Sequence, residues 1–354
     1  MQSTERTRAR ASASVDPSKP EQVRMALLRF LAERGMRGVR FVTPPQPISG
    51  GYDTLIFGFQ IEGDDVQPEW RNPLVLRLYA AFDQEARAEH EANVQRFAAA
   101  RGYPALAPLA AEGGDNAFGF PLMIVPRIVG GTLAQRMLSN PLAMRRWLGR
   151  MADLHASLHA LSVDNCPLTY GTPLVERQLE LLRRRIERRS LRQFEEGYAW
   201  LAGEKIRVLD EQPALCHADF HPLNILVDEQ NSLVVIDWTE AAIGDRHFDV
   251  ARTMATLWFA KLGGRGVTER LLLRGLRGFL RDGYLEAYGR SASLEPERLS
   301  YWESFHVFAT WLSIAELPFD TRVVKPAAVL NLGDGIGEEM RQRFWTCTAG
   351  SSSA

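Results

Sequence analysis

Hydrophobic positions in the first third of the chain follow the spacing of a helix and then that of short strands. Apolar residues recur at helical spacing in residues 21–34, which predicts an amphipathic helix. Apolar runs broken by glycine and proline follow at 47–61, 73–79 and 121–126, a pattern typical of strands and tight turns. Residues 83–101 are expected to form a helix between two of these runs. We therefore expect a β-rich first region.

Helical spacing dominates the remainder of the chain. It predicts helices around residues 147–161, 267–289 and 296–316, and one long helix over 175–198 whose many arginines would form a solvated face. A polar turn between two apolar runs predicts a β-hairpin at 225–236. The second region is thus expected to be mainly helical.

This change of pattern predicts an α+β fold with two lobes. The β-rich lobe would occupy residues 21–126 and the larger helical lobe residues 127–345. Residues 1–20 and 346–354 are rich in small and polar residues, so we expect them to form a disordered leader and tail.

Composition narrows the class of protein. The 354 residues are 45% hydrophobic, which permits a full core, but no apolar run approaches the ~20 residues that would span a membrane. The N-terminus lacks the apolar segment of a secretion signal, and Cys166, Cys216 and Cys347 are few and unclustered, so we expect a cytoplasmic protein with reduced thiols. A net charge of −1 does not indicate nucleic acid as a partner.

Residues 217–224, with the sequence His-Ala-Asp-Phe-His-Pro-Leu-Asn, carry the clearest chemical signal. Phosphoryl transfer needs a carboxylate near the attacking hydroxyl and oxygen ligands for magnesium. Asp219 can supply the carboxylate, while Asn224 and Asp237, at the two ends of the predicted hairpin, can supply the ligands. Each residue taken alone would fit an ordinary turn, and it is their order and spacing that favour a catalytic loop.

Two further interpretations of this loop stay open. His217, Asp219 and His221 could bind zinc, although no further cysteine or histidine cluster completes a coordination shell. The other role for His217 is to brace the loop by hydrogen bonding. Cys216 is expected to be a packed strand residue.

The loop and Asp237 resemble the aminoglycoside phosphotransferase and choline kinase family, the small-molecule branch of the protein-kinase-like fold. Ala218 stands where protein kinases carry arginine, and Trp238 follows Asp237 in place of Phe-Gly; both departures fit the small-molecule branch. Residues 244–252 resemble the family segment that closes the site, where Asp245 and Asp249 would contact the acceptor or the loop. A helix N-cap is the favoured role for Asp249. Residues 158–161 resemble a segment that buttresses the catalytic loop.

The resemblance also implies a nucleotide site in the β-rich lobe. Gly50 and Gly51 would form the loop that contacts the phosphates; the alternative is that they form only a turn. Arg77 would replace the usual phosphate-binding lysine; the alternative is that it faces solvent at the edge of a strand. A glutamate would hold Arg77, with Glu91 preferred over Glu89. The backbone of Pro126 and Ile128 would bind adenine, although an apolar strand that ends there explains the same residues.

Together these features predict a kinase that uses ATP, with GTP as the alternative donor, and Mg²⁺ to phosphorylate a hydroxyl group of a small molecule. Asp219 would be the catalytic base, and Phe220 and His221 would shape the acceptor site. The near balance of acidic and basic residues over 261–345 argues against a strongly cationic acceptor. A catalytically silent nucleotide-binding module and a protein kinase remain as alternatives; the short segment between Asp237 and Asp249 disfavours the second.

Overall fold

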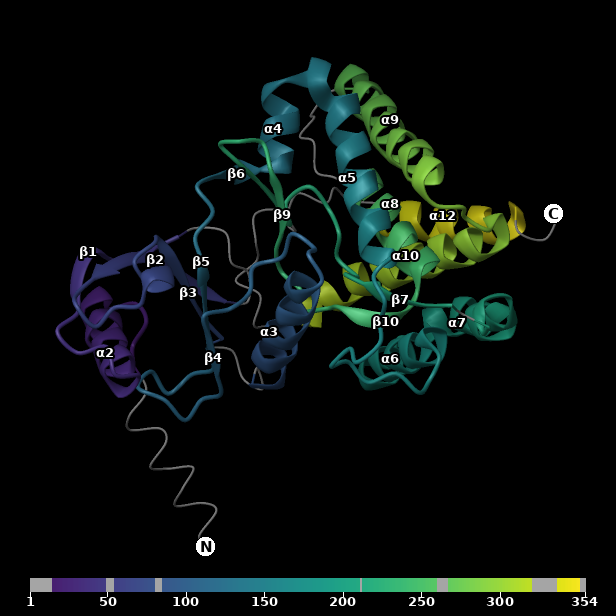
Figure 1. The fold of residues 1–354 in the computed structure, drawn as a ribbon. Helices are drawn as coiled ribbons and strands as arrows, with labels where there is room; N and C mark the ends of the chain where they lie inside the picture. The colour runs from purple at the N-terminus through teal and green to yellow at the C-terminus, as the bar shows by residue number, and fades with distance from the viewer. Residues whose placement is uncertain are drawn as a thin grey trace, which may run out of the picture. The chain divides into compact units, whose positions relative to one another are not determined.

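The chain divides into two compact units. The computed structural model describes residues 15–48, 54–79, 85–210, 212–259, 267–319 and 336–350. The first unit comprises Met1–Thr132 with Ile225–Thr239, and the second comprises Leu133–Asn224 with Glu240–Ala354 (Figure 1).

The division differs from the predicted boundary between residues 126 and 127. A three-stranded antiparallel sheet explains the difference, because β6 (Gly130–Thr132) pairs with β8 (Ile225–Asp228), which pairs with β9 (Leu233–Val235). The predicted hairpin therefore forms, but its hydrogen bonds join it to the first unit.

The first unit is built on a five-stranded antiparallel sheet in the order β1-β2-β3-β5-β4. Its strands are β1 (Arg40–Pro47), β2 (Leu55–Glu62), β3 (Leu74–Leu78), β4 (Ala110–Glu112) and β5 (Leu122–Pro126). A short 3-10 helix, η1 (Pro68–Trp70), lies between β2 and β3.

The predicted amphipathic helix forms α2 (Pro20–Glu33) and covers one face of this sheet. Its buried Leu27, Phe30 and Leu31 join one apolar cluster with the strands. Burial of each of these large side chains contributes roughly 1.5–3 kcal/mol.

Alternation along β3 decides where its charged residue lies. Leu74, Leu76 and Leu78 are buried in the cluster shared with α2. Successive strand residues point to opposite faces, so Val75 and Arg77 lie on the other face. That face packs against α3 (Glu85–Ala100), the helix expected at 83–101.

The second unit is mainly helical, as expected. Its longer helices are α4 (Leu133–Ser139), α5 (Met144–His159), α6 (Leu174–Arg189), α7 (Glu195–Glu204), α8 (Arg246–Phe259), α9 (Val267–Ser291), α10 (Pro296–Glu316) and α12 (Ile336–Gly350). Single turns of 3-10 helix form η2 (Pro141–Ala143), η3 (Arg192–Phe194), η4 (Lys205–Val208) and η5 (Leu317–Phe319). No helix in the described part of the chain is long and apolar enough to cross a membrane.

Two short strands complete the second unit. β7 (Pro213–Cys216) pairs antiparallel with β10 (Ala242–Asp245), and Cys216 is buried in β7 as expected. Helix α10 packs against α8 and α12, around a cluster that includes Trp302, Phe305 and Phe344. The loop from β7 to β8 and the start of α8 are thus anchored to a packed helical core.

The prediction of one helix over 175–198 is wrong. Helix α6 ends at Arg189, and Ser190 adopts a left-handed backbone conformation with φ of 52°. The Leu191 amide bonds back to the Ile186 carbonyl, which closes the helix C-terminus. The chain then turns so that Phe194 enters the core, and periodicity alone does not reveal this break.

Residues 15–20 and 346–350, which were predicted to be disordered, are ordered. Helix α12 extends to Gly350, and its Thr348 side chain is buried, so residues 346–350 are helical and not part of a disordered tail. At the other end, the Val15 amide donates to the Phe118 carbonyl, and α2 begins at Pro20. Contacts with the folded units order these residues despite their polar composition.

Candidate active site

Asp219 and Asn224 lie together in the loop that leaves β7. The Asn224 side-chain amide donates to Asp219 Oδ2 at 3.1 Å and to the Asp219 carbonyl at 3.0 Å. His221 Nε2 lies 3.2 Å from the same carboxylate oxygen. Arg252 Nη2 donates to the other oxygen, Oδ1, at 3.2 Å. The carboxylate is therefore held on both sides, while 28% of its side chain remains exposed.

The surroundings of Asp219 keep it ionised. Burial by itself would raise the pKa of this carboxyl, but the hydrogen bond and charge of His221, followed by the charges of Arg252 and His217, lower that pKa below its usual range. An ionised carboxylate that is partly exposed can accept a hydrogen bond from a substrate hydroxyl.

Asp249 supports this loop by hydrogen bonds to its backbone. Its carboxylate accepts the backbone amide of His217 at 2.5 Å and that of Ala218 at 2.9 Å. Ala218 has a φ of 62°, a left-handed conformation that needs such support in a residue with a Cβ. Asp249 therefore holds the loop that carries Asp219.

The favoured N-cap role of Asp249 is wrong, because Asp245 takes it. Asp245 Oδ1 accepts the backbone amide of His247 in the first turn of α8, at 2.9 Å. Its Oδ2 accepts the indole N–H of Trp302 at 3.0 Å. The N-cap lies just before the helix, whereas Asp249 lies inside the first turn and turns its carboxylate to the loop.

Two histidines of α5 flank Asp249. His155 Nε2 and His159 Nε2 lie 3.0 and 3.2 Å from Asp249 Oδ2. Their Nδ1 atoms bond the hydroxyl groups of Tyr284 and Tyr288, each at 2.7 Å. Burial lowers the pKa of His155 to about 4, so this ring is neutral at pH 7. His159 belongs to the segment that resembles the loop buttress of the family, and its position agrees with that role.

The zinc interpretation of residues 217–221 is not supported. Among the described residues, the only group of three potential ligands whose atoms converge is His155, His159 and Asp249. Those atoms already contact one another, and Asp249 also binds two loop amides. His217 is buried, and its Nδ1 accepts the Asp219 amide at 3.3 Å, so it braces the loop as the alternative interpretation expected.

Phe220 does not shape an acceptor site. Its side chain is fully buried and stacks on His155, with ring centroids 4.0 Å apart. Its carbonyl accepts the Thr253 hydroxyl at 2.7 Å. Phe220 anchors the loop to α5 and α8, and of the two residues predicted to line the acceptor site only His221 remains partly exposed.

Arg77 forms a buried ion pair in the first unit. Its guanidinium pairs with Glu91 of α3, and only 12% of the Arg77 side chain is exposed. Tyr79 and Gln95 donate to the same carboxylate, at 2.6 and 3.0 Å. Burial opposes the charge of Arg77, but Glu91 and Tyr79 raise its pKa further above the usual value.

This arrangement settles two alternatives about Arg77. The partner of Arg77 is Glu91, whereas Glu89 is exposed. Arg77 is not a solvent-facing residue of a strand edge, because β3 lies inside the sheet between β2 and β5.

Asp237 follows β9 and lies near Arg77. Its Oδ1 is 3.8 Å from Arg77 Nη2 and accepts the Thr239 hydroxyl at 3.0 Å. The backbone of Asp237 is left-handed, with φ of 65°, and its side chain is 43% exposed. The structure thus brings Arg77, Glu91 and Asp237 together in the first unit, and Asp219 and Asn224 in the second.

The other residues predicted to bind the nucleotide are Gly50, Gly51, Pro126 and Ile128. Gly50 and Gly51 lie outside the described residues. Pro126 ends β5 opposite Leu74, and Ile128 follows it outside any strand. Within the described chain, no hydrogen-bond acceptor is found for the Ile128 amide. An adenine ring could use this amide, so the structure is compatible with the predicted adenine contact of Pro126 and Ile128.

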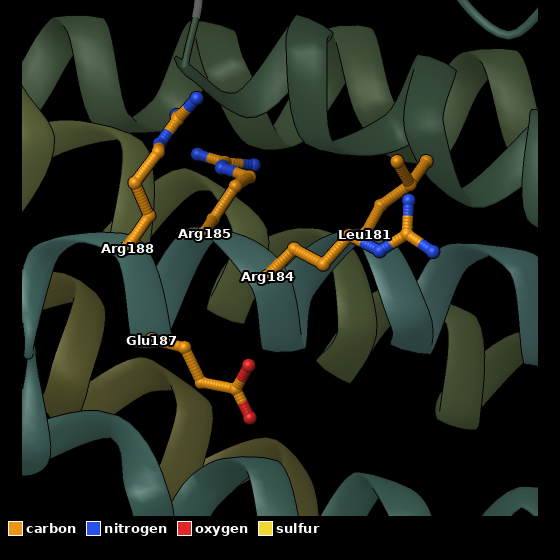
Figure 2. Close-up of a pocket in the computed structure, with 5 residues that line it drawn as sticks. All are labelled: Leu181, Arg184, Arg185, Glu187 and Arg188. Carbon is orange, nitrogen blue, oxygen red and sulfur yellow. The ribbon is translucent and has the colours of Figure 1, made fainter.

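The pocket drawn in Figure 2 carries no predicted site residue. It lies along α6 and is lined by Leu181, Arg184, Arg185, Glu187 and Arg188. Arg184 pairs with Glu180 one turn earlier at 2.7 Å, and Arg188 is 64% exposed. These contacts agree with the predicted solvated arginine face.

The comparisons with known proteins agree with this geometry. The family model described as the phosphotransferase enzyme family matches residues 25–302. The chain belongs to this family. The match includes the loop of Asp219, the Arg77 strand and the Asp249 helix. The predicted family is therefore confirmed.

The curated relatives of this phosphotransferase-family chain include aminoglycoside 3'-phosphotransferases. It is 26% identical over 174 residues to an aminoglycoside 3'-phosphotransferase of Streptomyces fradiae, a match that covers 45% of the chain and 58% of that protein. The chain spans less than two thirds of the length of the curated relatives that it matches.

Solved structures show the same fold. A macrolide 2'-phosphotransferase from Brachybacterium faecium aligns with a TM-score of 0.55 at 17% identity, over 87% of this chain and 99% of that one. A thermostable mutant of aminoglycoside phosphotransferase APH(4)-Ia, in a ternary complex with ADP and hygromycin B, aligns with a TM-score of 0.58 at 16% identity, over 93% of this chain and 99% of that one. The predicted kinase-like α+β fold class is confirmed.

Two contacts of the site were not predicted from the sequence. Tyr79 and Arg252 contact Glu91 and Asp219, respectively. The position of Arg252 could have been inferred, because it follows Asp249 by three positions and residues with this spacing lie on the same face of a helix.

Proposed function

We propose that this chain is an ATP-dependent kinase that transfers a phosphoryl group to a hydroxyl of a small molecule. The observation that carries the proposal is the ionised, partly exposed carboxylate of Asp219, held by Asn224 and Arg252 in a loop that Asp249 fixes through two backbone amides. Membership of the phosphotransferase family supports the same reaction class.

Asp219 would act as the base. A substrate hydroxyl would donate a hydrogen bond to its carboxylate, and the hydroxyl oxygen would then form a bond to the γ-phosphorus of ATP. The bond between that phosphorus and the oxygen of the leaving ADP would break, and the hydroxyl proton would pass to Asp219. Because the pKa of Asp219 is low, its main contribution would be to orient the hydroxyl and to accept the proton late.

Arg77 would bind phosphate oxygens of the nucleotide. A guanidinium remains charged and can contact two phosphate oxygens at once, which lets it replace a lysine. Glu91 fixes its orientation, since Glu91 is itself held by Tyr79 and Gln95. Gly50 and Gly51 would contact the phosphates, and the backbone of Pro126 and Ile128 would bind adenine, or guanine if GTP is the donor.

Asn224 and Asp237 would hold Mg²⁺. The ion would neutralise the phosphate charge when bound. The donor set suits a hard cation: Asp237 offers a carboxylate that is 43% exposed, and the Asn224 side-chain nitrogen bonds Asp219, which leaves its amide oxygen for a ligand.

ATP turnover over a panel of acceptors tests the proposal. The panel contains sugars, amino alcohols, homoserine and aminoglycosides, and formation of ADP and of phosphorylated acceptor is measured. Asp219→Ala should lower the turnover number by about 10²- to 10⁴-fold. The exposed Asp65 provides a matched control, because Asp65→Ala removes a carboxylate far from this loop in sequence.

Other outcomes would favour the alternatives. Nucleotide binding without turnover of any acceptor would favour a silent module, and phosphorylation of proteins alone would favour a protein kinase. If Asp219→Ala phosphorylated the acceptor as fast as the wild type, Asp219 would not be the base.

A further inference from the structure

Arg252 places a positive charge beside the proposed base. It lies on α8, its Nη2 donates to Asp219 Oδ1 at 3.2 Å, and 37% of its side chain is exposed. Among the carboxylates of the described residues, Asp219 is the only one paired with Arg252. A guanidinium carries five N–H donors, so the bond to Asp219 leaves donors for a further ligand.

Among the described residues, the side chains that contact the Asp219 carboxylate are those of His221, Asn224 and Arg252, and none of these carries a negative charge. The charged groups that act most on Asp219 are His221, Arg252 and His217, and all three stabilise a negative charge. The carboxylate of Asp249 also contacts the loop, but it is fully buried and its two oxygens accept the backbone amides of His217 and Ala218. Of the three charged groups that act most on Asp219, Arg252 has the most exposed side chain, at 37% against 14% for His221.

We propose that Arg252 is a substrate-recognition residue that binds a carboxylate or phosphate group of the acceptor, close to the hydroxyl that is phosphorylated. The inference rests on the proposed kinase function and names its substrate class. One donor of Arg252 would hold Asp219 while others bind the acceptor anion, and the planar guanidinium suits such paired contacts. The hydroxyl and the anion would then lie only a few bonds apart in the acceptor.

The geometry also indicates which acceptors are disfavoured. An ammonium group next to the reacting hydroxyl would approach Arg252, and the two described carboxylates of this loop region, Asp219 and Asp249, are already hydrogen-bonded. Like charges so close repel each other even when water screens them. Acceptors with an amino group next to the hydroxyl should therefore be poorer substrates than their neutral or anionic analogues.

The test compares acceptors that differ in the charge of one group at one carbon atom. Two matched sets serve: glycerate, glycerol and 3-amino-1,2-propanediol, and glucuronate, glucose and 6-amino-6-deoxyglucose. Glycerol 3-phosphate and glucose 6-phosphate separate a requirement for phosphate from one for carboxylate. The value of kcat/KM is measured for each acceptor with the wild type, Arg252→Gln and Arg252→Lys. Arg183→Gln is the matched control, since Arg183 is an exposed arginine of α6 that pairs with Glu187.

The wild type should prefer the anionic member of a set, and Arg252→Gln should lower the ratio of anionic to neutral kcat/KM by about 10- to 100-fold. Arg252→Lys keeps the positive charge but loses the paired N–H donors of the planar guanidinium, so it should give an intermediate ratio of anionic to neutral kcat/KM. Arg183→Gln should leave the ratio unchanged.

Two results would overturn the inference. If Arg252 only positions Asp219, Arg252→Gln lowers kcat for every acceptor equally and preserves the ratio. If the wild type prefers the amino member of either set, the acceptor is not anionic. Both outcomes leave the kinase function intact, whereas a wild type that phosphorylates no member of the panel defeats the proposed function and this inference with it.

Discussion

Asp249→Asn should loosen the loop that carries Asp219 without changing the size of the side chain. The wild-type carboxylate accepts two buried backbone amides, from His217 at 2.5 Å and from Ala218 at 2.9 Å. An asparagine can accept only one of them with its oxygen, and its NH₂ group must face the other N–H. One buried donor then loses its partner.

The magnitude follows from these bonds. An unpaired buried donor costs about 1–3 kcal/mol, and the remaining bond no longer involves a charge. We therefore expect the free energy of unfolding to fall by about 2–4 kcal/mol, a large part of the ~5–15 kcal/mol typical of a domain. The turnover number should fall as well, because Asp219 lies only two residues from His217.

Urea unfolding and hydrogen exchange measure the two effects separately. The midpoint of unfolding reports stability, and faster exchange of the His217 and Ala218 amides locates the loss in the loop. Asp153→Asn is the control, because Asp153 is exposed on α5 and its loss should change stability by less than about 0.5 kcal/mol. Unchanged stability together with unchanged amide exchange in Asp249→Asn would refute this account of the loop.

The same variant should show a defined dependence on pH. Burial alone would raise the pKa of Asp249, but its contacts with His155 and His159 hold it well below the usual 3.8. A depressed pKa stabilises the fold above the unfolded-state value and loses that contribution as pH falls through the folded-state value. The stability difference between wild type and Asp249→Asn should thus be constant from about pH 5 to 8 and shrink in stronger acid.

Three further predictions concern other parts of the chain. Glu91→Gln should weaken ATP binding by about 10-fold or more, measured as KM for ATP, because it removes the negative charge that holds Arg77. An unchanged KM would show that the ion pair of Arg77 and Glu91 does not contribute to nucleotide binding. Gly130→Ala should lower stability in a urea titration by at least about 1 kcal/mol, since a Cβ there would lie 2.1 Å from the Val227 carbonyl oxygen; wild-type stability would contradict this close approach. The free energy of unfolding of the wild type should fall as pH drops from 6.5 towards 4. The reason is that His155, with its pKa lowered to about 4, stays neutral in the folded state but takes up a proton in the unfolded state. His155→Gln should make the free energy of unfolding depend less steeply on pH over this range.

Much of the local structure could be predicted because it depends on neighbouring residues. The helix around residues 21–34, the β3 strand and the hairpin after Asn224 follow from periodicity and turn residues, and all three form. The break at Ser190 was missed, since Leu191 and Phe194 continue an apolar pattern that fits a helix as well as a turn into the core.

The partners of charged residues were harder to predict. Glu89 and Glu91 are equally plausible in the sequence, but residues two positions apart on a helix do not share a face, so the rotation of α3 against the sheet selects Glu91. In the same way, Phe220 looked like a residue of the acceptor site until its stacking on His155 showed it to be buried.

The sequence by itself determined the chemistry that this chain can offer. The order of Asp219, Asn224 and Asp237 around a hairpin is a property of consecutive residues, and it predicted the family that the comparisons show. Only the tertiary structure decided how that chemistry is held and directed: Asp249 supports the loop and does not cap its helix, and Arg252 reaches Asp219 from 33 positions away. Contacts over such distances depend on how whole helices and strands pack, which the local pattern of the chain does not encode.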